Sequence, residues 1–150
     1  MAFFFGLVAI TALFYGISWV TQLDYLRPVQ HDMLLAAAFM FTMIGVSHLR
    51  KPDLMLYMVP EGLPAPRLLV YLSGVAEIVL SVGLLVPATR TVSAWGLIVL
   101  LIAIFPANIN VAVNNLPPPG GLPAKPWYIW SRLLFQPLYI GWIWYAAIAP

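Results

Sequence analysis

Long apolar runs alternate with short polar or proline-rich connections along the whole chain. At about 1.5 Å per residue, a helix of about twenty residues crosses the ~30 Å hydrocarbon core of a bilayer. Five runs approach or reach this length: Met1–Leu23, Met33–Leu49, Pro66–Pro87, Val92–Val113 and Ile129–Ala149. The second becomes long enough if residues 30–32 form its first turn. The pattern therefore predicts an all-α membrane protein with five transmembrane helices in a single domain, residues 1–150, and with its termini on opposite sides.

The connections contain residues that end helices or join close neighbours. Pro52 stops the second run, Pro87–Thr91 is a tight connection between antiparallel neighbours, and Asn114–Pro126 is rich in proline and glycine. Met1–Leu23 lacks the basic start and the cleavage site of a signal peptide, so we expect it to be retained as a helix. Residues 33–149 are expected to form a compact antiparallel bundle that folds without this first, peripheral helix.

Composition narrows the class of protein. The chain is 63% hydrophobic and 8% charged, whereas soluble domains carry about 25% charged residues. A net charge of +2, scattered along the chain, does not indicate a nucleic-acid partner. The absence of cysteine excludes disulfides, thiol catalysis and cysteine-ligated iron–sulfur clusters. We expect no metal site and no cofactor held by the protein.

Basic residues are unevenly shared between the two ends of the predicted helices. One end, here called the basic face, carries five: Arg50, Lys51, Arg67, Lys125 and Arg132. The other carries Arg27 and Arg90. Because cytoplasmic loops are enriched in Lys and Arg, we expect the basic face and the N-terminus to be cytoplasmic, in a bacterial cytoplasmic membrane.

The third run has an acid, Glu77, near its middle. A charged, unpaired side chain there costs about 2.5 kcal/mol or more, so such residues face the bundle interior and mark functional sites. Ser73, Glu77 and Ser81 recur every four residues and share one helix face. Two interpretations stay open: an acid/base or ligand-binding group, or a protonated carboxyl that only bonds a neighbouring helix.

The other polar side chains inside the runs fall in the half of the membrane next to the basic face. With Ser73 and Glu77 they suggest a pocket that opens toward that face, with Glu77 at its floor and directed toward the fourth run. These candidates are His48, Asn108, Asn110, Arg132 and Gln136. No catalytic residue is assigned among them.

Simpler roles exist for the same residues. The amides can bond neighbouring helices, His48 can be a satisfied interfacial histidine, and Arg132 can extend to the interface. Asn108 and Asn110 are two residues apart, so an ideal helix points them about 200° apart. Only one of them can face Glu77 unless Pro106, which removes a backbone hydrogen bond, distorts the helix.

Four segments together resemble the DoxX-like family of small membrane proteins. They read IGVSHLRKPDLMLYMVP, RLLVYLSGVAEIVLSVGLLVPATRTVSAWGLI, FPANINVAV and RLLFQPLYIGWIWY. The resemblance covers Met33 onward as a four-helix core and leaves Met1–Leu23 as an extra helix. It implies a link to quinone-dependent oxidation, since the family is named after a subunit of that kind. More distantly, the core resembles the sterol isomerase and sigma-2 receptor group, whose intramembrane acids line a pocket for hydrophobic amines or sterols.

These observations favour a cofactor-free membrane subunit that anchors or completes a hydrophobic, quinone-side pocket of a larger redox or respiratory complex. Its expected partners are the bilayer and other membrane subunits, and a quinone or a lipid would be the bound molecule. His31 and His48 lie at opposite ends of the second run, so they cannot ligate one haem. One alternative is a stand-alone protein that binds or isomerises a small hydrophobic molecule with Glu77 as acid/base. A further alternative is a small transporter or assembly factor.

Overall fold

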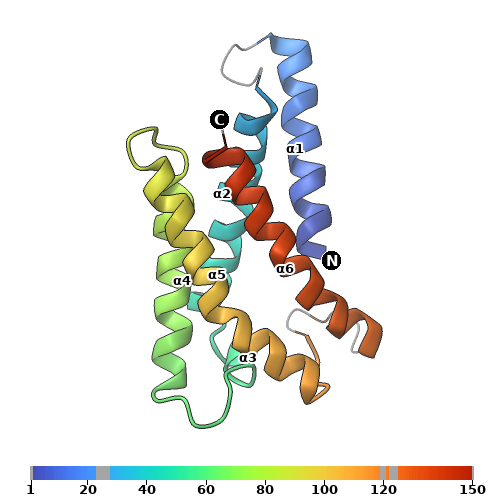
Figure 1. Cartoon of the computed structure of the whole chain (residues 1–150), viewed down its shortest axis with the longest axis vertical. Coiled ribbons are helices and arrows are strands. Elements are labelled where there is room, and N and C mark those ends of the chain that lie inside the picture. The colour runs from blue at the N-terminus through green and yellow to red at the C-terminus, as the bar shows by residue number, and fades with distance from the viewer. Residues whose placement is uncertain (1, 23–27, 119–120, 122–124, 150) are drawn as a thin grey trace.

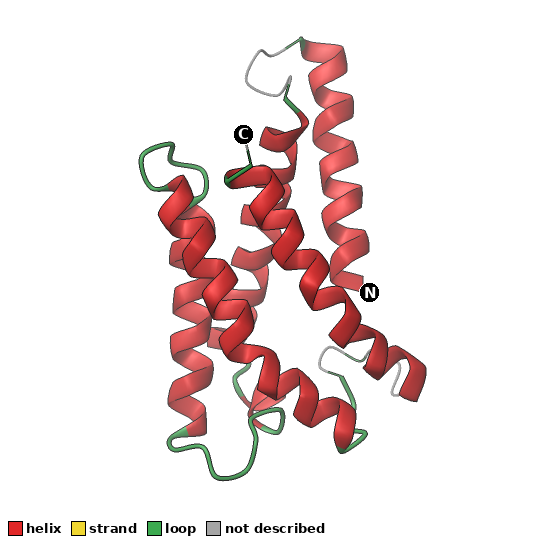
Figure 2. Cartoon of the chain, in the orientation of Figure 1, coloured by secondary structure: helices red, strands yellow, loops and turns green. Residues whose placement is uncertain are grey.

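The helices begin and end where prolines and polar residues interrupt the apolar runs. The computed structural model describes residues 2–22, 28–118, 121 and 125–149, and within them all regular structure is helical (Figures 1 and 2). The six helices are α1 (Ala2–Thr21), α2 (Val29–Arg50), α3 (Asp53–Leu56), α4 (Pro66–Gly83), α5 (Arg90–Val113) and α6 (Pro126–Ala147). Residues 30–32 do form the first turn of α2, as expected.

Four of these helices, α1, α2, α4 and α5, are long and apolar enough to cross a membrane. Most of their residues are not buried inside the protein, which indicates an integral membrane protein in contact with the lipid bilayer. The fifth expected span corresponds to α6, which has 22 residues. It is less apolar than the other four because it contains Arg132, Gln136 and Pro137 as well as several Trp and Tyr residues.

The long helices pack around α2, which contacts α1, α4 and α6, while α5 contacts α4 and α6 (Figure 1). The main core lies between them and is built from aliphatic and aromatic side chains. Its buried members include Leu34, Phe41, Leu97, Leu101 and Ile143.

Helix α1 lies along the outside of this bundle but is tied to its centre. Leu7 is fully buried in the core. Phe3 stacks edge-on against Phe41 and Tyr139, with ring centroids 5.0 and 4.9 Å apart. These contacts tie α1 to the bundle even though it buries no charged side chain. That residues 33–149 fold without it stays a prediction.

A second, smaller core closes the basic face. Met58, in the loop after α3, packs with Val111 and Ala112 of α5 and Ile129 of α6. The short helix α3 packs against α4, where Asp53 pairs with Arg67. The first part of the loop after α3 is thus packed against the ends of α5 and α6 through Met58, while residues 61–65 are exposed.

Helix α5 continues through Pro106 without interruption. It changes direction along its second half (Figure 1), as a proline inside a helix causes. One turn before Pro106, the carbonyl of Leu101 accepts a hydrogen bond from the Gln136 amide of α6. The predicted distortion is therefore a bend, supported by a side chain of the next helix.

Candidate functional site

The site begins at a close crossing of α2 and α4. A Cβ atom built on Gly45 would lie 2.6 Å from the carbonyl oxygen of Gly74. One built on Gly74 would lie 2.7 Å from Cβ of His48 and 2.9 Å from the carbonyl oxygen of Gly45. Only glycine allows the two backbones to approach this closely. The crossing brings the last turns of α2 directly against the middle of α4.

At this crossing Glu77 of α4 meets His48 of α2. Nδ1 of His48 lies 3.0 Å from Oε2 of Glu77, and the two side chains are 13% and 3% exposed. Oε2 has no hydrogen-bond partner of good geometry in the described structure, so the two groups are in close polar contact without a straight hydrogen bond. Ser73 adds its hydroxyl 3.5 Å from the same ring nitrogen.

The polar face of α4 is directed at α2 along its length. One turn from Glu77, the hydroxyl of Ser81 lies 2.7 Å from that of Thr42 on α2, and Ser81 is fully buried. The prediction that Ser73, Glu77 and Ser81 share one interior face is confirmed. The expected neighbour differs: the polar partner of Glu77 is His48 on α2 and not an asparagine of the fourth run, because the glycine crossing brings α2 closer.

A second polar cluster joins α5 to α6. The side-chain nitrogen of Asn108 donates to Oε1 of Gln136 at 2.7 Å. Arg132 donates through Nη2 to Oδ1 of Asn108 at 3.2 Å, while its Nη1 is buried with no hydrogen-bond partner in the described structure. Gln136 completes the network by donating to the Leu101 carbonyl. These three candidates therefore form one continuous chain of hydrogen bonds.

Asn110 belongs to neither cluster. Its amide nitrogen donates to the carbonyl of Met58 at 3.1 Å, and Asn114 donates to its oxygen at 2.7 Å. Asn108 and Asn110 thus serve different partners, as their spacing predicts. Asn110 holds the loop after α3 beneath α5.

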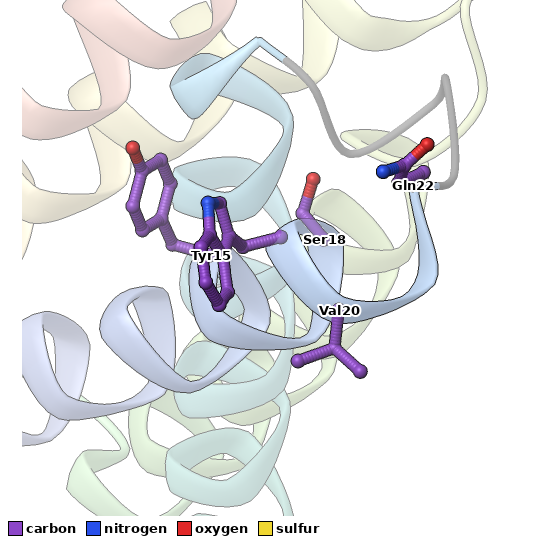
Figure 3. Close-up of a pocket in the computed structure, with 5 residues that line it drawn as sticks. Tyr15, Ser18, Val20 and Gln22 are labelled. Atoms are coloured by element: carbon purple, nitrogen blue, oxygen red, sulfur yellow. The ribbon is translucent and has the colours of Figure 1, made fainter.

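The seven candidates fall into separate hydrogen-bonded groups, and a shared pocket with Glu77 at its floor stays a prediction. Ser73, Glu77 and His48 form one cluster and Asn108, Arg132 and Gln136 form another. Among the described residues, no hydrogen bond or ion pair links the two. A surface hollow occurs beside the C-terminal end of α1, where Tyr15, Ser18, Trp19, Val20 and Gln22 line it (Figure 3); none of these is a candidate.

Two residues of interest fall outside the sequence prediction. Thr42 pairs with Ser81, and the only signal for it is a hydroxyl inside an apolar run. Asp32, in the first turn of α2, is fully buried, and neither of its carboxylate oxygens has a hydrogen-bond partner in the described structure. The helix dipole favours an acid near a helix N-terminus, but it does not predict that this acid is buried.

A carboxyl beside an imidazole is suited to holding and passing on a proton. An imidazole has one ring nitrogen that donates and one that accepts a hydrogen bond, and a carboxyl can accept or donate a proton when geometry allows. The described residues contain no group of three or more His, Cys, Asp or Glu side chains that could hold a metal ion. The arrangement therefore favours proton chemistry or polar recognition of a ligand.

Comparison with known proteins gives one family. Residues 35–147 match the family model described as a domain of unknown function, DUF8561. The match begins inside α2 and ends with the last residue of α6, so α1 lies outside it. No curated protein and no solved structure matches the chain. Because the matched segment covers most of the sequence, the protein belongs to the DUF8561 family.

Proposed function

We propose that this protein is a cofactor-free membrane subunit that completes a hydrophobic, quinone-side pocket of a larger redox complex. Its own chemical contribution is the His48–Glu77 pair, which exchanges a proton between the basic face and the membrane interior. The observation that supports this is the 3.0 Å contact between a buried carboxyl and a less buried imidazole. An ionisable residue inside a span is a candidate functional group by default, and here its partner is identified.

The positions of the two groups fit proton exchange. His48 lies in the last turn of α2, next to the basic residues Arg50 and Lys51, and Glu77 lies deeper in α4. Reduction of a quinone to a quinol consumes two electrons and two protons. The electrons would come from a redox-active partner subunit, since this chain has no cysteine and no metal-binding cluster among its described residues. The imidazole can take protons from water and the carboxyl can present them to the interior.

The outer surface fits a subunit embedded among lipids and other helices. Large apolar side chains are exposed on α4 and α5, among them Val79, Val92, Val99 and Ile102. The likeness of four sequence segments to the DoxX-like family, which includes a subunit linked to quinone-dependent oxidation, supports the same assignment. We include α6 as a fifth span and place the N-terminus in the cytoplasm of a bacterium, following the basic-face bias.

A stand-alone pocket protein is the second candidate. The observation that favours it is the missing straight hydrogen bond at Oε2 of Glu77, which leaves the acid able to accept one from a hydrophobic amine or hydroxyl ligand. In that case Glu77 acts as acid/base or counter-ion and His48 sets its charge.

Purification at native expression in a mild detergent separates the two candidates. We expect redox-active membrane subunits to co-migrate with the protein, and we expect Glu77→Gln to assemble normally while quinone-dependent turnover of the complex falls. The control is Ser131→Ala, because the Ser131 hydroxyl bonds the Tyr128 carbonyl of its own helix and lies outside the His48–Glu77 cluster. A protein that purifies alone with a retained small hydrophobic molecule would contradict the subunit proposal and support the second candidate.

A further inference from the structure

Arg132 carries a charge that the protein does not neutralise. Its Nη2 donates to Asn108, but Nη1 is buried and has no hydrogen-bond partner in the described structure. A guanidinium has five N–H donors and cannot lose its charge in a protein. An unmade hydrogen bond from a buried charged group is strongly unfavourable, so a ligand that accepts it would be favoured.

No acidic side chain among the described residues neutralises this charge. Asp53 and Glu77 each pair with a different base. Asp32 and Glu61 form no ion pair with Arg132. The missing anion must therefore come from outside the described protein.

Neutral groups surround the guanidinium instead. The phenols of Tyr57, Tyr128 and Tyr139 are near enough to interact with it electrostatically. Burial raises the pKa of Tyr57, and the charge of Arg132 opposes this rise. Tyr57 thus stays a neutral phenol at physiological pH. Its hydroxyl already donates to the Pro117 carbonyl, so this phenol does not replace the missing anion.

The depth of Arg132 corresponds to the lipid headgroup region. Trp127 and Trp130, in the first turns of α6, are 59% and 50% exposed, and exposed Trp marks the membrane interface. Arg132 follows Trp130 by two residues, about 3 Å along a helix. Arg132 is itself only half-buried, so its long side chain can bring Nη1 to the surface of the bundle without unfolding α6.

We propose that Arg132, assisted by Asn108, binds a phosphate group at the basic end of α5 and α6, and that an anionic phospholipid supplies this phosphate. Guanidinium groups pair with phosphate through strong, charge-assisted hydrogen bonds. Basic pockets between transmembrane helices bind anionic headgroups in this way. The site is separate from the His48–Glu77 pair and does not depend on its role.

The test compares lipids and variants on the full chain purified in an uncharged detergent. Native mass spectrometry counts retained phospholipids, and thermal unfolding is followed after adding phosphatidylglycerol, phosphatidylcholine of equal chain length, or inorganic phosphate. The variant is Arg132→Gln. The control is Arg67→Gln, which removes a charge from the same face where the side chain is exposed and already paired with Asp53.

We expect wild-type protein to retain one anionic lipid and to be stabilised more by phosphatidylglycerol than by phosphatidylcholine. Arg132→Gln should weaken phosphatidylglycerol binding about tenfold, as the loss of one charge-assisted hydrogen bond predicts, and Arg67→Gln should change it little. Inorganic phosphate could also stabilise wild type as much as the lipid does and leave Arg132→Gln unchanged. That result would support the phosphate site and assign it a water-soluble ligand.

Two outcomes would overturn the proposal. One is equal stabilisation of wild type by both lipids with no response to phosphate. This comparison uses wild type alone, so it can be made even if Arg132→Gln fails to fold. The other is an equal loss of lipid binding in Arg132→Gln and Arg67→Gln, which would indicate general attraction of anionic lipid to the basic face. Arg132→Lys, which keeps the charge, should retain part of the binding.

Discussion

The Glu77 carboxyl is held inside the bundle by one imidazole, that of His48, at 3.0 Å. Removing only the acid leaves the imidazole without its partner, and removing only the imidazole leaves a buried acid. Truncating either side chain should therefore lower the free energy of unfolding by more than the intact pair contributes to it.

We predict a coupled response to mutation of this pair. Glu77→Leu and His48→Leu should each lower the free energy of unfolding by about 1–3 kcal/mol, because each leaves a buried polar group unsatisfied. The double variant should lose less than the sum, with a coupling energy of about 1 kcal/mol or more. Unfolding in mixed detergent, followed by circular dichroism, measures all four proteins. Additive losses would mean that the two groups do not interact.

The interior position of Glu77 follows from the sequence, but its partner does not. A mid-span acid flanked at four-residue spacing by Ser73 and Ser81 has to face other helices. Which helix it meets depends on how closely α2 and α4 approach, and that is set by Gly45 and Gly74 together. One sequence shows the two glycines but not that they lie opposite each other. The sequence likewise does not show which faces of the other helices lie opposite each other, so it does not predict that Arg132 and Glu77 lie in separate clusters.

At the scale of helices, a proline and a tight turn explain two differences between predicted and observed boundaries. Pro126 stands at the start of α6, where its missing N–H is not needed, so the helix begins before the predicted Ile129. Helix α4 ends at Gly83 and not at Pro87, because Leu85 and Val86 bond the carbonyls three residues back, those of Val82 and Gly83, and so form tighter turns. Thr89 then donates to the Gly83 carbonyl at 2.9 Å and closes the turn.

The α2–α4 crossing leads to a prediction about side-chain volume. Gly45→Ala should lower the free energy of unfolding by about 1–3 kcal/mol, since the added methyl would overlap the Gly74 backbone. It should also separate His48 from Glu77. Gly141→Ala in α6 is the control, because nothing lies within 4 Å of its would-be Cβ. This control should be neutral or stabilising by up to about 1 kcal/mol through better helix propensity.

The same unfolding measurement compares the two alanine variants. If Gly45→Ala were as stable as Gly141→Ala, the backbones of α2 and α4 would have to lie further apart than the structure places them. The close crossing of α2 and α4 would then no longer explain why Glu77 is buried.

For the whole molecule, the open point is whether α6 crosses the membrane. Helices α1, α2, α4 and α5 are long and apolar enough to cross a membrane, whereas α6 combines spanning length with Arg132 and Gln136. Both side chains hydrogen-bond with Asn108 of α5, which directs Gln136 into the protein and leaves Nη1 of Arg132 for the proposed phosphate. Helix α6 also shares the main core through Ile143 and Ala146. A helix whose polar side chains are satisfied by neighbouring helices or at the headgroup level can face lipid with its remaining surface.

We therefore predict that the two ends of the chain lie on opposite sides of the membrane. The protein has no cysteine, so single cysteines introduced by Ala2→Cys, Glu61→Cys and Ala149→Cys report position without background. In intact cells, a membrane-impermeant maleimide should label Ala149→Cys alone. After the cells are opened, Ala2→Cys and Glu61→Cys should react as well, because both lie on the basic face, which the excess of Lys and Arg places in the cytoplasm. Labelling of Ala2→Cys and Ala149→Cys from the same side would show that α6 does not span.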